Sequence, residues 1–251
     1  MIIKESEYAD IATPTGPMRT YIYRPAAPGR YPGILFFSEI FQVTGPIRRT
    51  AGLIAGHGFV VAVPEVYHEL EPAGTVLAYD QAGADSGNKH KITKEVSAFD
   101  SDARAALDFL KTHPACTGKL GVLGICLGGH LSFRAAMNSD VQAGVCFYAT
   151  DIHKRSLGKG LSDNTLDRMA EIKAEMLMIW GRQDPHIPAE GRALIYNAMT
   201  AAGIKFTWHE FNGAHAFMRD EGPRYDPALA TVCYGMVLEL YKRKLGEGDL
   251  A

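Results

Sequence analysis

The segment GICLG at residues 124–128 places a cysteine between two glycines, where an apolar run ends and a helical pattern begins. A chain that turns sharply from a strand into a helix needs small residues beside the turn, because the flanking backbone closes up there. The thiol of Cys126 would project from the turn at a helix N-terminus, where the backbone dipole favours a thiolate. Glycine is common in this chain, so it is the strand-to-helix setting, more than the motif, that predicts a nucleophile for acyl chemistry.

A cysteine nucleophile needs a base, and the base needs a group that orients it. Asp184 closely follows the apolar run MLMIW, and His215 closely follows the run KFTWHEF. In sheets with this type of turn the catalytic residues come in the order nucleophile, acid, histidine, each after a later strand. Cys126, Asp184 and His215 are therefore the predicted catalytic residues, and His186 is the alternative base among the nine histidines.

These residues need a sheet to position them, and strand-length apolar runs do alternate with helical patterns along the chain. Strands are predicted at residues 18–24, 34–37, 59–64, 120–123, 143–148, 176–180 and 205–211. Helices are predicted at residues 47–55, about 94–111, from about 127 onward, 190–202 and 227–245. The alternation predicts an α/β fold, a mostly parallel doubly wound sheet with helices on both faces. Ligands of such sheets bind at the carboxyl ends of the strands.

One stretch, residues 68–97, interrupts the alternation within a single predicted domain that spans residues 1–251. It is polar, rich in glycine and too long for an ordinary connection between a strand and a helix. Two interpretations stay open: a solvated excursion, and a flap over the active site.

The composition is ordinary for a globular chain, with 47% hydrophobic residues, 22% charged residues and a net charge of -2. Its dispersed charges argue against nucleic acid or a membrane surface as a partner, which leaves a small molecule as the expected partner. The charged N-terminus argues against a signal peptide, and the apolar runs are too short to cross a bilayer. The four separated cysteines favour a reduced, cytoplasmic protein without a disulfide framework or zinc site. A monomer and a small homo-oligomer are both open.

The motifs around these residues resemble the dienelactone hydrolase family of α/β-hydrolases. The resemblance spans about residues 21–245 and rests on GICLGG with Cys126 in place of serine, GRQDPHIP around Asp184, GAHAFMR around His215, and SEIF at residues 38–41. It implies the α/β-hydrolase fold and a carboxymethylenebutenolidase-like hydrolase that cleaves a lactone or ester through a thioester, with no metal or other cofactor. The alternatives are an acyltransferase or peptidase on the same fold, and a ligand-binding sensor with low turnover.

The resemblance also implies roles for residues near the nucleophile. Glu39 would lie beside Cys126 and take part in activating the thiol, although a strand-end carboxylate that caps the next turn is an open alternative. The backbone N–H groups of Ile40 and Leu127 would form the oxyanion hole.

Substrate contacts follow from the same resemblance. Arg219, four residues after His215, would bind the carboxylate of a small substrate, and Phe41 and Tyr148 would line the pocket or belong to the core. The second carboxylate-binding arginine of the family falls within residues 68–97, where this chain departs from the pattern and offers no match. Dienelactone itself is therefore a less secure expectation than hydrolysis.

Overall fold

The structure is a computed structural model that describes residues 1–246 and 249–250. Its main sheet has the order β1-β2-β4-β3-β5-β6-β7-β8, and β9 pairs with the start of β3. The pairs from β4 through β3 to β8 are parallel, whereas β1, β2 and β4 pair antiparallel. The strands are β1 (Ile3–Thr13), β2 (Gly16–Pro25), β3 (Gly29–Phe37), β4 (Val60–Pro64), β5 (Cys116–Ile125), β6 (Val141–Phe147), β7 (Glu175–Gly181), β8 (Phe206–Phe211) and β9 (Asp249–Leu250).

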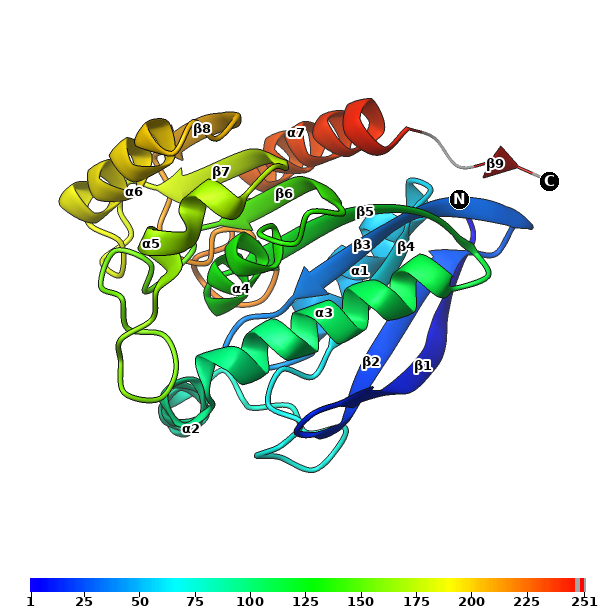
Figure 1. The fold of residues 1–251 in the computed structure, drawn as a ribbon, viewed down its shortest axis with the longest axis horizontal. Helices are drawn as coiled ribbons and strands as arrows, with labels where there is room; N and C mark the ends of the chain where they lie inside the picture. Colours follow the sequence, from blue (N-terminus) through cyan, green and yellow to red (C-terminus); the bar gives the residue numbers. More distant parts are fainter. Residues whose placement is uncertain (247–248, 251) are drawn as a thin grey trace.

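Helices cover both faces of this sheet, as predicted (Figure 1). In that view α3 and α4 lie in front of the sheet, and α1 lies behind it. A hydrogen bond of 2.9 Å between the hydroxyls of Thr50 in α1 and Tyr234 in α7 joins two helices behind the sheet. The helices are α1 (Gly45–Gly56), α2 (Gln81–Thr93), α3 (Val96–Thr112), α4 (Leu127–Ala135), α5 (Thr165–Arg168), the short 3-10 helix η1 (Met169–Glu171), α6 (Ala189–Ala201) and α7 (Pro227–Leu245).

The central strands are buried on both sides, which is why they read as continuous apolar runs. Every residue of β4 is buried, as is every residue of β3 from Tyr31 to its end. Strand β1 differs because it pairs only with β2 at the edge of the sheet, and Ile11 is its one buried residue. Its charged sequence gave no strand signal, so the predicted strands began too late, at residue 18. The prediction of a mostly parallel α/β sheet is confirmed.

Helix α2 lies within residues 68–97, where no helix was predicted. Its first turn is capped by Asp80, whose side chain accepts a hydrogen bond of 2.8 Å from the backbone N–H of Gly83. Beyond its other end, the fully buried Lys94 donates hydrogen bonds to the backbone oxygen of Val66 at 3.0 Å and to Asp102 at 2.5 Å. The cap is local to the helix, whereas the bonds of Lys94 fix the end that follows the helix to the body of the protein.

The parallel strands bring their carboxyl ends to one edge of the sheet. β3, β5, β6, β7 and β8 run in the same direction, so the loops that follow them meet at that edge. All the residues predicted to do chemistry follow one of these strand ends. None of the helices in the described residues combines the length and the apolar character that a membrane crossing requires.

Candidate active site

Cys126 lies at a sharp turn between β5 and α4. Its backbone has φ 60 and ψ -120, a conformation that side-chain-bearing residues rarely adopt. The flanking glycines allow the turn, because a Cβ on Gly124 would overlap the carbonyl oxygen of Gly128 and a Cβ on Gly128 would overlap the carbonyl oxygen of Phe37. The backbone N–H of Cys126 donates a hydrogen bond of 3.0 Å to Phe147 at the end of β6. The strained turn is thus held between two neighbouring strands.

The three predicted catalytic residues lie in one chain of contacts. Nε2 of His215 is 3.2 Å from Sγ of Cys126, and Nδ1 of the same ring is 2.6 Å from Oδ2 of Asp184. An ionised carboxylate only accepts hydrogen bonds, so Nδ1 carries a proton and donates a hydrogen bond to Asp184. The other oxygen of Asp184 accepts a hydrogen bond of 2.8 Å from the backbone N–H of His186. This arrangement can move a proton between the sulfur and the ring.

The surroundings of His215 favour its protonated form. Burial of the ring opposes a positive charge, but the neighbouring Cys126 sulfur and the hydrogen bond to Asp184 outweigh that effect and raise the pKa of His215 to about 10. An imidazolium beside the sulfur stabilises a thiolate, which is the reactive form of cysteine.

Glu39 follows the end of β3 and is buried together with the catalytic residues. Its Oε2 accepts a hydrogen bond of 2.9 Å from the hydroxyl of Tyr79, and the Tyr79 ring carries the Arg219 guanidinium at 4.2 Å from its centroid. Burial raises the pKa of the Glu39 carboxyl above its ordinary value, and the positive charge of Arg219 only partly offsets this effect. Glu39 is therefore a carboxyl group that is costly to ionise in the folded protein.

We expect Glu39→Gln to raise the Tm at pH 7. A carboxyl whose folded pKa is raised contributes its full stability at low pH and loses it as the pH rises through the folded pKa. Glutamine avoids this loss and can still accept the hydrogen bond from Tyr79. A gain of about 2–4 °C, the shift that roughly 1 kcal/mol produces in a domain of this size, should be seen by calorimetry.

The gain should shrink as the pH falls toward 4.5, the ordinary value for glutamate, and should be absent below it. Glu5→Gln, a change at an exposed glutamate of β1, serves as the control and should leave the Tm unchanged. An equal gain at pH 7 and at low pH would contradict the burial argument.

Ile40 and Leu127, whose N–H groups were predicted to form the oxyanion hole, come directly after Glu39 and Cys126 in the chain. Leu127 is the first residue of α4, so its N–H has no partner within the helix. Ile40 lies in the loop after β3 and lines the same pocket as Glu39 and Cys126. Within the described part of the chain, neither N–H donates a hydrogen bond to another protein group.

A pocket of about 550 Å³ opens over the sulfur. Phe41 and Arg219 line it, as expected from the resemblance, and so do His186 and the α2 residues Ala84 and Asn88. Residues 68–97 thus supply part of the pocket wall, through the segment from Tyr79 to Lys91.

Tyr148, by contrast, lies under the pocket and not on its wall. Its side chain is fully buried, and its ring contacts the rings of His215 and Phe217 with centroid distances of 4.9 and 5.3 Å. Tyr148 does not line the pocket that contains Cys126. It is a core residue whose ring packs against the imidazole of His215. The sequence could not separate these two positions, because an aromatic residue at a strand end suits both.

Several charged pocket residues were not singled out from the sequence: Lys91, Asp151, Lys154 and Arg224. Lys91 in α2 pairs with Asp151 in the loop after β6 at 2.9 Å, so two distant segments meet across the pocket wall. Lys154 and Arg224 add positive charge to the lining. Lys91 lies in α2, Asp151 and Lys154 lie in the loop after β6, and Arg224 lies in the loop after β8, so only the folded arrangement brings them together.

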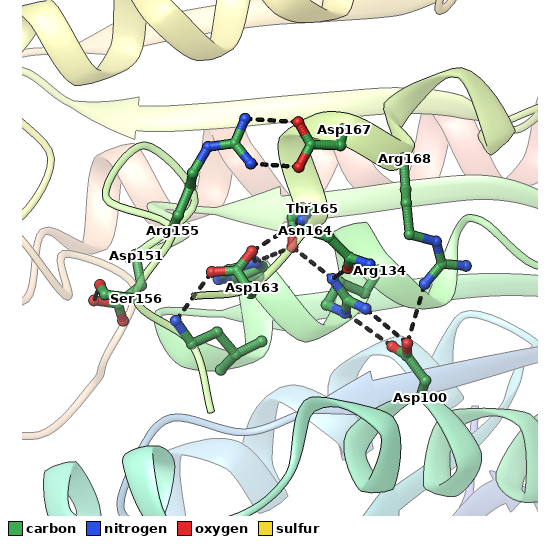
Figure 2. Close-up of polar contacts among 12 residues, drawn as sticks. Asp100, Arg134, Asp151, Arg155, Ser156, Asp163, Asn164, Thr165, Asp167 and Arg168 are labelled. Atoms are coloured by element: carbon green, nitrogen blue, oxygen red, sulfur yellow. Dashed lines mark hydrogen bonds and ion pairs between the residues drawn. The ribbon is translucent and has the colours of Figure 1, made fainter. Parts of the chain in front are cut away.

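The loop after β6, which carries Asp151 and Lys154, is fixed to helix α4, which directly follows Cys126 (Figure 2). Asp163 accepts hydrogen bonds of 3.0 Å from the backbone N–H groups of Leu157 and Thr165. The Thr165 hydroxyl in turn contacts two side chains of α4, His130 at 2.7 Å and Arg134 at 2.8 Å. His130 is fully buried in this network and takes no part in the pocket lining. The pocket wall and the nucleophile therefore share one rigid support.

The donor atoms of Asp184, His186 and His215 lie within 4.8 Å of one another, a spacing that could hold a metal ion. However, Nδ1 of His215 is bonded to Asp184 and Nε2 faces the Cys126 sulfur. A metal ion at this position would have to break the hydrogen bond between Asp184 and His215, so the arrangement suits proton transfer better than metal binding.

Comparison with known proteins identifies relatives over almost the whole chain. The family model described as "Dienelactone hydrolase family" matches residues 18–245. The chain is 41% identical to the "Putative carboxymethylenebutenolidase" of Saccharomyces cerevisiae, with 98% of this chain and 93% of the relative covered. It is 28% identical to the "Carboxymethylenebutenolidase" of Pseudomonas sp. (strain P51), with 86% and 87% covered.

A solved structure described as "Putative Dienelactone Hydrolase from Klebsiella pneumoniae subsp. pneumoniae MGH 78578" has the same fold. The TM-score is 0.84, the identity is 21%, and the match covers 97% of this chain and 100% of the other. The predicted α/β-hydrolase fold is therefore confirmed, and the family model that matches is that of the family which the sequence motifs resemble. The chain belongs to the dienelactone hydrolase family.

Proposed function

We propose that this member of the dienelactone hydrolase family hydrolyses a small carboxylated lactone or ester, with Cys126 as the nucleophile. The observation that carries the proposal is the chain of contacts from the Cys126 sulfur through the His215 ring to Asp184, at the floor of a pocket of about 550 Å³. The names of two relatives, "Putative carboxymethylenebutenolidase" and "Carboxymethylenebutenolidase", support a lactone as the substrate.

The first half of the proposed reaction forms a thioester. The Cys126 thiolate attacks the carbonyl carbon of the lactone, and its sulfur lies at a helix N-terminus that favours the negative charge. The carbonyl oxygen becomes an oxyanion, which the N–H groups of Ile40 and Leu127 stabilise. The bond to the ring oxygen then breaks, and this oxygen takes the proton from Nε2 of His215.

The second half consumes one water molecule. His215, now neutral, removes a proton from water, and the resulting hydroxide attacks the thioester carbonyl. The second oxyanion uses the same two amides, and its collapse releases Cys126 as a thiolate and the product as an acid. Asp184 holds the ring in one orientation during both proton transfers.

The charges of the pocket support an anionic substrate. Arg219, Arg224 and Lys154 line it on the solvent side of the catalytic residues. Among the acidic residues of the lining, Asp151 is paired with Lys91 and Asp80 caps helix α2. Positive charge is therefore available for a substrate carboxylate, and the planar guanidinium of Arg219 matches its two oxygens.

The test compares enol lactones with and without a carboxylate on wild type and Arg219→Ala. Wild type should hydrolyse the carboxylated lactone, and Arg219→Ala should lower kcat/KM for it about 10- to 100-fold, the range expected for a hydrogen bond to a charged group. The neutral lactone should change less than about threefold, because it lacks the group that Arg219 binds.

Arg19→Ala, which removes an arginine paired with Asp10 at the β1–β2 edge of the sheet, is the matched control and should change neither rate. Equal losses on both lactones would show that Arg219 does not bind the carboxylate. Failure of the wild-type protein to hydrolyse any lactone or ester would overturn the proposed function.

A further inference from the structure

Helix α2 packs against the loop that holds Ile40, one of the two expected oxyanion-hole residues. Gly87 is one of the two buried residues of this helix, and a Cβ built on it would overlap the carbonyl oxygen of Ile40. The same Cβ would lie 2.9 Å from Cβ of Ile40 and 3.1 Å from its carbonyl carbon. The helix backbone therefore touches Ile40 on two sides, and only glycine allows this approach.

The rest of the loop after β3 is tied to the same excursion. Gln42, a buried residue with a φ of 65, donates a side-chain hydrogen bond of 3.1 Å to the oxygen of Thr75 and accepts one of 3.2 Å from the N–H of Tyr67. The backbone N–H of Leu77 donates a bond of 3.1 Å to the oxygen of Phe41. Contacts with residues 67–87 thus hold the conformation of this loop.

Helix α2 is itself held in place and cannot yield easily. The buried hydroxyl of Tyr67 donates a hydrogen bond of 2.9 Å to the oxygen of Gly87. Tyr79, just before the helix, donates a hydrogen bond of 2.9 Å to Glu39, and the buried Lys94 fixes the other end. A group added at Gly87 would therefore push on Ile40 against a supported helix.

We infer that helix α2 sets the position of the Ile40 N–H, and that Gly87 is a positioning residue for the oxyanion hole. The inference rests on the proposed function, in which this amide stabilises the oxyanion of each half-reaction. Gly87 touches no substrate and acts through Ile40. The Cβ and the carbonyl group of Ile40 both contact the helix. A displacement of Ile40 would therefore also move its N–H away from the reacting oxygen.

Two reactions of Cys126 separate this role from general damage. Ester hydrolysis passes through an oxyanion that the two amides stabilise. In alkylation by iodoacetamide, the Cys126 sulfur displaces iodide from a saturated carbon, and no oxyanion forms. Gly87→Ala should lower kcat/KM for an ester about 10²- to 10³-fold, the loss expected when one oxyanion donor is removed. The alkylation rate should stay within about twofold of wild type, because the sulfur and His215 do not depend on this amide.

Gly235→Ala in α7 is the matched control, because a Cβ at that helical glycine meets open space. It should leave both reactions unchanged. Tyr67→Phe supplies a second variant if Gly87→Ala does not fold: loss of the bond to the Gly87 oxygen should lower ester hydrolysis about threefold to tenfold without slowing alkylation.

The outcomes are distinct. Normal ester hydrolysis by a folded Gly87→Ala variant would overturn the inference while the proposed function stands. An equal fall in hydrolysis and alkylation would also overturn it, since the sulfur itself would then be disturbed. Absence of ester hydrolysis in the wild type, with normal alkylation of Cys126, would instead remove the proposed function on which the inference rests.

Discussion

Cys126→Ala should lower kcat for ester or lactone hydrolysis by at least about 10⁴-fold and leave the fold intact. The thiolate is the only group at the turn that can form the thioester, and the oxyanion hole and His215 alone would support only slow attack by water. Alanine can take the same backbone conformation at the same cost as cysteine, because both carry an ordinary Cβ at φ 60. Circular dichroism and the Tm should therefore match the wild type.

The control is Cys233→Ala, which removes another buried free thiol from α7, and its turnover should stay at the wild-type level. Rapid acid quenching of the wild type during turnover, followed by intact-mass and peptide analysis, should give an acyl adduct on Cys126. Cys126→Ala should give none. Unchanged turnover in Cys126→Ala, or an adduct on another residue, would remove Cys126 from the reaction.

The three residues that we propose to be catalytic stand out in the sequence because each depends on local pattern. Asp184 follows the buried strand β7 and His215 follows the partly exposed edge strand β8, each by a few residues, and parallel strands deliver such loops to one edge of the sheet. The glycines around Cys126 mark a turn whose backbone leaves no room for a Cβ beside it. The family match then agrees with these motifs over residues 18–245. Their close approach in space, at 3.2 and 2.6 Å, was not visible in the sequence.

Helix α2 and the edge strand β1 were missed for a physical reason. Only Gly83 and Gly87 are buried in α2, so it has no apolar stripe to mark a helix, and its glycines suggest a loop. Gly83 is needed because of a local contact with Ala78, five residues before it, whereas the need for Gly87 arises from Ile40, which lies elsewhere in the fold. Strand β1 similarly buries little and pairs only at the edge. Both elements are specified by tertiary contact more than by local pattern.

Charged residues on separate loops set a similar limit on the site. The pairing of Lys91 with Asp151 and the burial of Glu39 under Tyr79 depend on segments that are far apart in the sequence. The placement of Tyr148 under His215, away from the pocket, also depends on packing that no motif encodes. The sequence thus brought out the proposed reacting groups more clearly than the charged residues of the pocket wall.

Asp184→Asn should lower kcat by about 10³- to 10⁴-fold, nearly as much as loss of the nucleophile. The two oxygens of Asp184 accept from different donors, Nδ1 of His215 at 2.6 Å and the N–H of His186 at 2.8 Å. Asparagine has one acceptor oxygen, so an amide that keeps the bond to His186 turns its NH₂ group toward Nδ1. The ring must then carry its proton on Nε2, which faces Cys126, and the neutral ring can no longer take the proton of the thiol.

The pH dependence of alkylation tests this explanation apart from turnover. Removal of the carboxylate takes away one of the interactions that raise the pKa of His215 to about 10, so the thiolate should lose its stabilising imidazolium. Alkylation of Cys126 by iodoacetamide near neutral pH should therefore slow in Asp184→Asn and recover toward wild type as the pH rises. Asp108→Asn, at an exposed aspartate of α3, is the control for the substitution and should match wild type in both assays. Two results would contradict this role: turnover of Asp184→Asn within threefold of wild type, or an unchanged pH profile of alkylation. Asp184 would then only stabilise the loop after β7, and another group would have to orient the imidazole.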